Sequence, residues 1–273
     1  MSLAALHSQS VWIREVLPFY KTQEVFLRMN IKIIFGAFLG IGLMATTTLA
    51  DNIVVVPGGF SGTEANTSDN APLGASEQHF QQVFSVALLT NLVAGDFING
   101  IAFRVDGSET SLPAQTVTTY NIGMSQSPNA PGSLSSTFSA NRGADYLTVR
   151  SGPLTLRAGD FSGGASPNTF GWISFSTPYL YTGGNLLVEI AYQGFSIGRD
   201  ADAAYPYNPS LAQSAFGTGF SSTAADAGLY SEAIVMGFSV ETVSSVPEPS
   251  ASAMFVVGVM FLGMQMRRKS RTT

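Results

Sequence analysis

Cysteine is absent from this 273-residue sequence, and charged side chains are scarce, at 11%. Without cysteine the protein has no disulfide bonds, thiol catalysis or cysteine zinc sites, so the fold must rest on a hydrophobic core. The scarcity of Lys, Arg and Glu disfavours helical bundles, which are rich in these residues. What is abundant is glycine, with 28 residues, together with Ser and Thr, a composition that favours short strands joined by turns.

Lysine is missing from residues 51–246, where fifteen Asp and Glu stand against five Arg and give a formal charge of −10. Proteins that bind nucleic acids need clustered Lys and Arg to neutralise phosphates. We therefore expect no nucleic-acid partner. The remaining basic residues lie in the two terminal segments.

An apolar stretch, residues 33–44, follows Lys32 and leads to small residues before Asp51. A short basic region, an apolar region and a small-residue cleavage site are the three parts of a secretory signal peptide. Twelve apolar residues are short for a hydrocarbon layer of about 30 Å, which argues against a permanent anchor or span. We expect residues 29–50 to form a signal helix that is cleaved between Ala50 and Asp51.

Residues 1–28 precede this signal and carry several charged side chains, among them Arg14 and Glu15. A signal peptide has a short basic start, and Met29 supplies one. We interpret residues 1–28 as an overcalled translation start or an extension.

The carboxy-terminal segment, residues 244–273, contains a second apolar run. Residues 250–266 carry no formal charge, and these seventeen positions are near the lower limit for a transmembrane helix. The basic end, residues 267–271, follows at once, and the positive-inside rule places it in the cytoplasm as a stop signal. Its first three residues are Arg267, Arg268 and Lys269. Both terminal segments therefore predict that the body lies outside the inner membrane.

Before the apolar run stands the strip Val246-Pro247-Glu248-Pro249-Ser250, in which two prolines favour an extended backbone. Taken alone, the strip is a proline-rich spacer before an anchor. With the apolar run and the basic end behind it, it resembles the PEP-CTERM sorting signal of Gram-negative bacteria that produce exopolysaccharide. The resemblance implies that an exosortase recognises Pro247, Glu248 and Pro249 and cuts the tail there. It also implies transient anchoring in the inner membrane and a final place at the cell surface or in the extracellular matrix.

Apolar and polar residues alternate with a period of two in several short segments of the body, which is typical of half-buried strands. The candidate strands cover residues 53–56, 81–86, 101–105, 116–124, 147–150, 171–175, 186–192 and 234–240. Residues 208–227, rich in Ser, Ala, Gly and Thr, are interpreted as a long loop. This pattern predicts an all-β body over residues 51–243, an antiparallel β-sandwich of the jelly-roll kind. It would be flanked by an N-terminal signal helix and a single C-terminal transmembrane helix. Residues 134–149 and 178–190 also resemble a β-sandwich domain of exported proteins, a resemblance that carries no activity.

His79 is the only histidine of the body, and no Gly-x-Ser-x-Gly motif accompanies it. We interpret it as a surface or strand-edge residue and expect no catalytic residue and no enzymatic activity. A secreted hydrolase that depends on His79 is the third hypothesis for function.

Two acids and two aromatic residues form the speculative ligand loop, within residues 200–208: Asp200, Asp202, Tyr205 and Tyr207. Turn carboxylates suit Ca²⁺, with Asp145 and Asp160 as further candidates, and exposed rings suit sugars. Because Asp in turns usually bonds its own backbone, we assign no metal and no cofactor and keep Ca²⁺ as an alternative. The rings expected in the core are those of Trp172, Phe175, Tyr179 and Tyr181.

Two functions follow. The first is a non-enzymatic envelope or matrix protein whose partners are the export machinery, an exosortase and the inner membrane. The alternative is a carbohydrate-binding module for exopolysaccharide, with or without Ca²⁺, that uses the ligand loop.

Overall fold

The computed structural model describes residues 52–242. The predicted signal peptide with its cleavage site at Ala50 and Asp51, the sorting motif, the apolar run and the basic end all lie outside the described residues. Within the described part, no helix has the length and apolar character needed to cross a membrane. Its helices are three short 3₁₀ turns: η1 (Gly58–Phe60), η2 (Val86–Leu88) and η3 (Phe138–Asn141).

The body is all-β, and every strand pair is antiparallel, as the sequence predicts. A four-stranded sheet has the order β1 (Asn52–Val56), β15 (Met236–Glu241), β4 (Phe97–Phe103), β9 (Gly171–Leu180). A six-stranded sheet has the order β13 (Gly228–Tyr230), β12 (Ala212–Gly217), β3 (Gln78–Phe84), β10 (Leu186–Tyr192), β6 (Tyr120–Gln126), β7 (Leu147–Arg150). Two smaller sheets consist of β14 (Ala233–Ile234), β11 (Ala201–Ala204), β2 (Thr67–Asp69), and of β5 (Gln115–Val117) with β8 (Leu154–Leu156).

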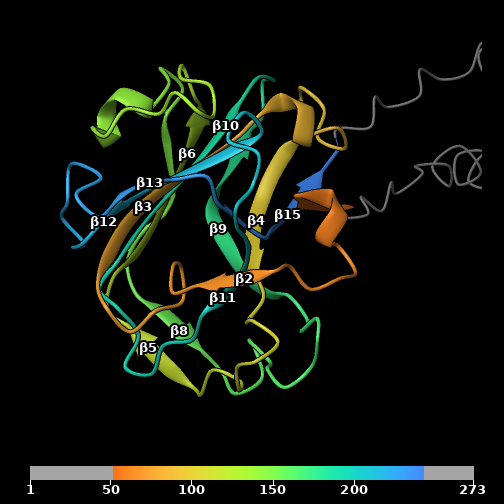
Figure 1. Cartoon of the computed structure of the whole chain (residues 1–273), viewed down its shortest axis with the longest axis vertical. Helices are drawn as coiled ribbons and strands as arrows, with labels where there is room; N and C mark the ends of the chain where they lie inside the picture. Colours follow the sequence, from red (N-terminus) through yellow and green to blue (C-terminus); the bar gives the residue numbers. More distant parts are fainter. Residues whose placement is uncertain (1–51, 243–273) are drawn as a thin grey trace, which may run out of the picture. The chain divides into compact units, whose positions relative to one another are not determined.

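The two large sheets face each other across one hydrophobic core (Figure 1). Alternate residues of each strand point into it, because successive side chains of a strand point to opposite faces. Phe84 of β3 and Phe238 of β15 meet edge to face with their ring centroids 6.3 Å apart. The result is a β-sandwich-like body whose core both sheets share.

A second, smaller apolar cluster lies on the other face of the six-stranded sheet. Leu134 and Phe138, from the segment that contains η3, pack against Val83 of β3 and Leu187 of β10. This segment covers part of the sheet face that would otherwise be open to water. The candidate site described below lies beneath its edge.

All eight predicted strand regions contain strands in the structure. Two details are wrong. Residues 208–227 are not one loop, because β12 forms there, pairs with β3 and packs Phe216 on Phe80, and these tertiary contacts outweigh a turn-like composition. Residues 116–124 are not one strand: the chain breaks at Thr118, so that β5 pairs with β8 while β6 joins the six-stranded sheet.

Candidate functional site

The predicted ligand loop is only partly a loop. Its first half is strand β11, and Asp202 within it is fully buried. Asp202 forms an ion pair with Arg104, which is buried as well, and the Nε of Arg104 lies 2.6 Å from Asp202 Oδ2. The expectation that Asp202 is available to a ligand is therefore wrong, because burial and the ion pair occupy its carboxylate.

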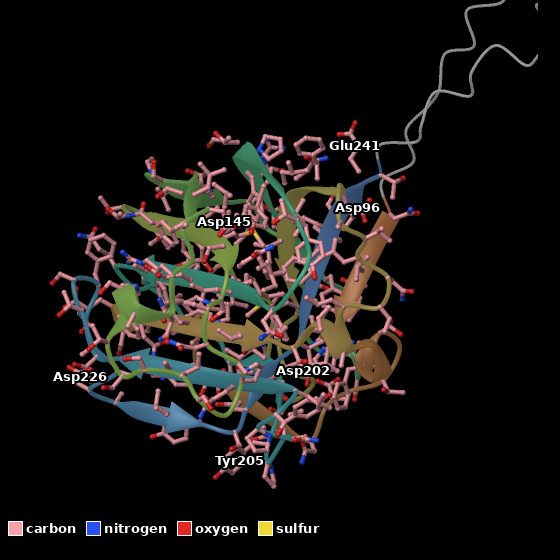
Figure 2. The ribbon with its side chains drawn as sticks, turned by 90° about the horizontal axis from the view of Figure 1, so that it is seen from above. Asp96, Asp145, Asp202, Tyr205, Asp226 and Glu241 are labelled. Atoms are coloured by element: carbon pink, nitrogen blue, oxygen red, sulfur yellow. The ribbon has the colours of Figure 1, made fainter. Side chains whose placement is uncertain are left out.

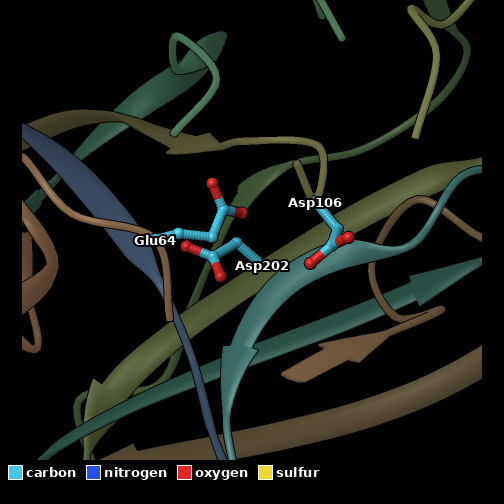
Figure 3. Close-up of side chains that lie close together, drawn as sticks. All are labelled: Glu64, Asp106 and Asp202. Carbon is cyan, nitrogen blue, oxygen red and sulfur yellow. The ribbon is translucent and has the colours of Figure 1, made fainter. Parts of the chain in front are cut away.

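Glu64 and Asp106 lie close to Asp202, and one carboxylate oxygen of each lies within 4.8 Å of the others (Figure 3). Glu64 Oε1 accepts a hydrogen bond from the Gly107 backbone N–H at 2.8 Å. Burial raises the pKa of Asp202, and the adjacent guanidinium of Arg104 acts in the opposite direction. Because Arg104 already supplies a positive charge here, we assign this acidic cluster to folding and no cation to it.

The other carboxylates considered for Ca²⁺ have local partners of their own. Asp145 accepts hydrogen bonds from the Gln126 N–H at 3.0 Å and the Tyr179 hydroxyl at 2.7 Å, and it lies well away from Asp202 (Figure 2). Asp160 accepts from the Arg157 N–H at 2.7 Å. The structure thus does not bring these acids together.

The two tyrosines of the predicted loop also separate. Tyr205 is 49% exposed, whereas Tyr207 is partly buried against the core. Asp200 accepts a hydrogen bond from the Ser68 hydroxyl at 3.1 Å. The arrangement offers one exposed ring rather than a platform of two.

The richest convergence of polar side chains lies on the outward face of the six-stranded sheet, around Glu189 of β10. His79 and Gln81 lie two residues apart in β3, and the strand register places Gln81 directly opposite Glu189. The His79 Nε2 lies 2.9 Å from Glu189 Oε1, and the Gln81 Nε2 donates to Oε2 at 2.6 Å. On its other side the His79 Nδ1 lies 2.6 Å from the Ser222 carbonyl oxygen.

Two further donors come from the segment that follows η3. Arg142 Nε donates to Glu189 Oε2 at 2.8 Å, and its Nη2 donates to Oε1. The Tyr146 hydroxyl donates to the same Oε1 at 3.2 Å. The Arg142 guanidinium also lies over the Tyr146 ring, 4.6 Å from its centroid, so the two side chains hold each other in place.

The surroundings decide how these groups are charged. Burial by itself would raise the pKa of Glu189, but hydrogen bonds from His79, Arg142 and Gln81 lower it to about 2. Burial, reinforced by the Glu189 charge, raises the pKa of Tyr146 to about 12. At neutral pH the centre is therefore a carboxylate surrounded by donors, with a neutral phenol beside it.

Two adjoining depressions, of about 340 and 220 Å³, open beside this network, and His79, Arg142 and Phe220 line both of them. Ser222 offers its carbonyl oxygen to His79, while its hydroxyl accepts a hydrogen bond from the Gly219 N–H at 3.1 Å. The geometry thus lacks the serine–histidine hydrogen bond of a nucleophilic site. The network instead holds the segment that contains η3 and the chain around Ser222 on the sheet.

His79 is neither a surface nor a strand-edge residue, because it is 7% exposed and lies in β3, between β12 and β10. Glu189, Arg142 and Tyr146 were missed by the sequence interpretation. A partial signal was present: His79 and Gln81 flank Phe80 in one strand, and Glu189 stands between Val188 and Ile190 in another. Polar residues on alternate positions of predicted strands mark a sheet face that something polar must cover.

A second buried acid, Glu232, lies apart from this network and beside Asp69 of β2. Burial raises the pKa of Glu232 to about 8, and the charge of Asp69 and a hydrogen bond to it act in the same direction. Burial raises the pKa of Asp69 too, as does the nearby Asp200. At neutral pH Glu232 is therefore protonated beside Asp69.

Comparison of the chain with protein-family models gives no match, and a search of curated proteins finds no relative.

Proposed function

We propose that this chain is an exported, non-enzymatic protein of the cell surface or extracellular matrix, sorted through its carboxy-terminal tail. The proposal joins the signal peptide at residues 29–50 with the PEP-CTERM-like tail at residues 244–273. An exosortase and the export machinery would be its processing partners, and the inner membrane its transient location.

One observation carries the proposal. The last strand, β15, ends at Glu241, and its last core residue is Val240. In the sequence, the strip that begins at Val246 therefore follows every strand of the described body. Cutting at Pro247-Glu248-Pro249 would remove the tail and leave each sheet complete, which is what a removable handle requires.

The strand orders support a jelly roll as the kind of sandwich. Setting β12 and β13 aside, the eight strands of the two large sheets can be numbered along the chain. They then lie in the orders 1-8-3-6 and 2-7-4-5, which is the double Greek-key arrangement of a jelly roll. Jelly rolls serve many functions, so this topology supports the architecture alone.

The state of Glu189 supports the non-enzymatic part of the proposal. Both of its oxygens accept hydrogen bonds, and its pKa of about 2 keeps it ionised at neutral pH. A general acid needs a proton to give, and a general base needs a lone pair free for substrate. Glu189 offers neither.

The test is to change Pro247-Glu248-Pro249 to three alanines in a Gram-negative host that carries an exosortase. We expect normal export and accumulation of the full-length protein in the inner membrane. The control changes Ser244 and Ser245, which lie beside the strip, to alanine and should be processed normally. Release of the triple-alanine variant at the normal rate would contradict the sorting function.

A second candidate function, binding of exopolysaccharide, is favoured by a different observation. Trp172 was expected in the core but is 38% exposed, on a sheet face where the adjoining groove has no charged lining residue. The burial of Asp202 removes the loop on which this function first rested, so the function needs another site.

A further inference from the structure

On the outward face of the four-stranded sheet, two neighbouring rows have small residues at every middle position and apolar residues at three of their four edge positions. The strand registers place these side chains in two cross-strand rows. One row is Val55, Gly237, Ala102 and Trp172, and the next is Ile53, Ser239, Gly100 and Ser174. The edge strands β1 and β9 thus form two walls, and the central strands β15 and β4 form a floor.

Trp172 lies across this sheet rather than standing up from it. It belongs to β9, yet its Cη2 atom lies 3.5 Å from the position that a Cβ on Gly237 of β15 would take. Between these two strands lies β4, whose Ala102 is fully buried. The indole therefore covers Ala102 and reaches Gly237, and a larger residue at either position would displace it. The part of the side chain that stays exposed lies on the outward face of the sheet.

Beside the indole lies a groove of about 400 Å³. Ile53, which is 60% exposed, stands on the opposite wall, with Ser239 and Gly100 between them. Asn99 and Ser174 add an amide and a hydroxyl to the lining. With neighbouring strands about 4.8 Å apart, β1 and β9 are roughly 14 Å apart, and the indole occupies part of this span in its own row.

The lining selects the chemistry of a ligand. All seven residues that form the groove are uncharged, on a body whose formal charge between residues 51 and 246 is −10. An acidic polymer would be repelled by the body, and a cationic one would find no carboxylate among the lining residues, since Glu241 lies outside the lining and accepts a hydrogen bond from Asn99 Nδ2 at 3.2 Å. A neutral pyranose fits both features, because its C–H face can stack on an indole while its hydroxyls bond to Ser and Asn side chains.

We propose that this groove binds a neutral polysaccharide, with Trp172 as the stacking residue and Ser174, Ser239 and Asn99 as hydrogen-bonding partners. The inference rests on the second candidate function and gives it a site. It is independent of the sorting tail, so failure of one leaves the other standing.

The chain itself provides a probe. Its two tryptophans are Trp12 and Trp172, so the Trp12→Phe variant of the full-length chain reports on the groove alone. The protein is purified in a mild detergent without a sugar headgroup and titrated with cellohexaose, mannohexaose and hexagalacturonic acid. We expect at least one neutral hexasaccharide to change the indole fluorescence in a saturable way, and the acidic one to leave it unchanged. Saturation with the acidic sugar alone, or no change with any of them, overturns the proposal.

Variants separate the groove from other surfaces. Binding to immobilised neutral glycan should weaken at least about tenfold in Trp172→Ala and in Ser239→Phe. The second variant places a large side chain on the floor of the groove and leaves Trp172 itself unchanged. Trp172→Phe should retain part of the affinity. Tyr205→Ala removes an exposed aromatic ring elsewhere and should bind like the parent.

Loss of glycan binding in Tyr205→Ala, with full binding in Trp172→Ala, would move the site to the loop and refute the groove. Self-association that Trp172→Ala abolishes, without glycan binding, would show that a second copy occupies the groove.

Discussion

Glu232 shows how one residue can make the stability of this body depend on pH. Its carboxyl group is buried, with Asp69 as its hydrogen-bonding partner and Asp200 near that partner. In the unfolded chain the pKa returns to about 4.5, so between the two values the native state holds a proton that the unfolded state does not. The stability that this proton contributes is fully present below the unfolded pKa of about 4.5. It is lost as the pH rises through the native pKa of about 8.

Glu232→Gln should therefore flatten the pH profile of the free energy of unfolding. The amide keeps a neutral donor beside Asp69, so the parent and the variant should be of similar stability near pH 5. Above pH 8 the variant should be the more stable, by on the order of 2 kcal/mol. Urea unfolding at several pH values measures the difference, and Glu77→Gln, at an exposed position, is the control. If the free energy of unfolding changed with pH equally in Glu232→Gln and in the parent, a protonated Glu232 in the native state would be contradicted.

Single residues also mark where sequence reasoning stops. Asp202 and Trp172 have their expected exposures reversed, the acid buried and the indole exposed. Neither reversal is visible locally, because the first depends on Arg104 arriving from another strand and the second on small residues at Ala102 and Gly237. Composition and periodicity describe one strand at a time, whereas these contacts join strands far apart in the chain.

At the scale of elements, the Glu189 network fastens irregular chain to the six-stranded sheet. Gln81 Nε2 donates to the Phe138 carbonyl at 3.0 Å, and Asn141 Nδ2 donates to Gln81 Oε1 at 2.9 Å. His79 bonds to the carbonyl of Ser222 in the same way. One carboxylate thus positions η3 on one side and the chain around Ser222 on the other.

Glu189→Ala should loosen these segments and lower the stability of the whole body. The change leaves Arg142 and His79 without their acceptor, and breaking a buried ion pair costs about 3–5 kcal/mol, less here because Arg142 is partly exposed. Urea unfolding gives the loss, and hydrogen exchange should show it concentrated around η3. The matched control is Glu109→Ala, which removes a partly exposed carboxylate 3.5 Å from Arg199 and should cost about 1 kcal/mol or less. Equal losses in the two variants would contradict the fastening role.

Most strands could be predicted from the sequence, because each large sheet has one face in the core and apolar and polar residues alternate along its strands. The outward layer was not. Its segments lack periodicity, and only the folded sheet places His79, Glu189 and Arg142 within reach of one another. The candidate site could therefore be predicted as a polar sheet face, but not as a network of particular residues.

For the whole molecule, the important pairing is that of β1 with β15, the first and last strands of the described body. Asn52 lies opposite Val240 in the register, and β15 lies between β1 and β4. The four-stranded sheet therefore depends on the last segment of the described body. Its core residues Met236, Phe238 and Val240 are all fully buried.

A chain that stops after Val235 should accordingly fail to form the sandwich, while one that stops after Ser245 should fold like the parent. The first lacks a central strand, which exposes Ile101, Val54 and their neighbours to water, whereas the second loses no described strand. Resistance to a protease during a time course distinguishes the two. Equal resistance would show that β15 is dispensable to the core.

If the chain is exported as proposed, the position of β15 also bears on the order in which the body folds. A chain that crosses a membrane from its amino terminus delivers β15 after every other strand of the described body, and β15 is the strand that must enter between β1 and β4. Pairings between such distant parts of a chain form slowly, because the long loop between them must close first. Until β15 has emerged, the four-stranded sheet therefore lacks one of its two central strands. Under the proposed export, this sheet can close only after Glu241 has crossed the membrane, so the order of the strands delays its folding until then.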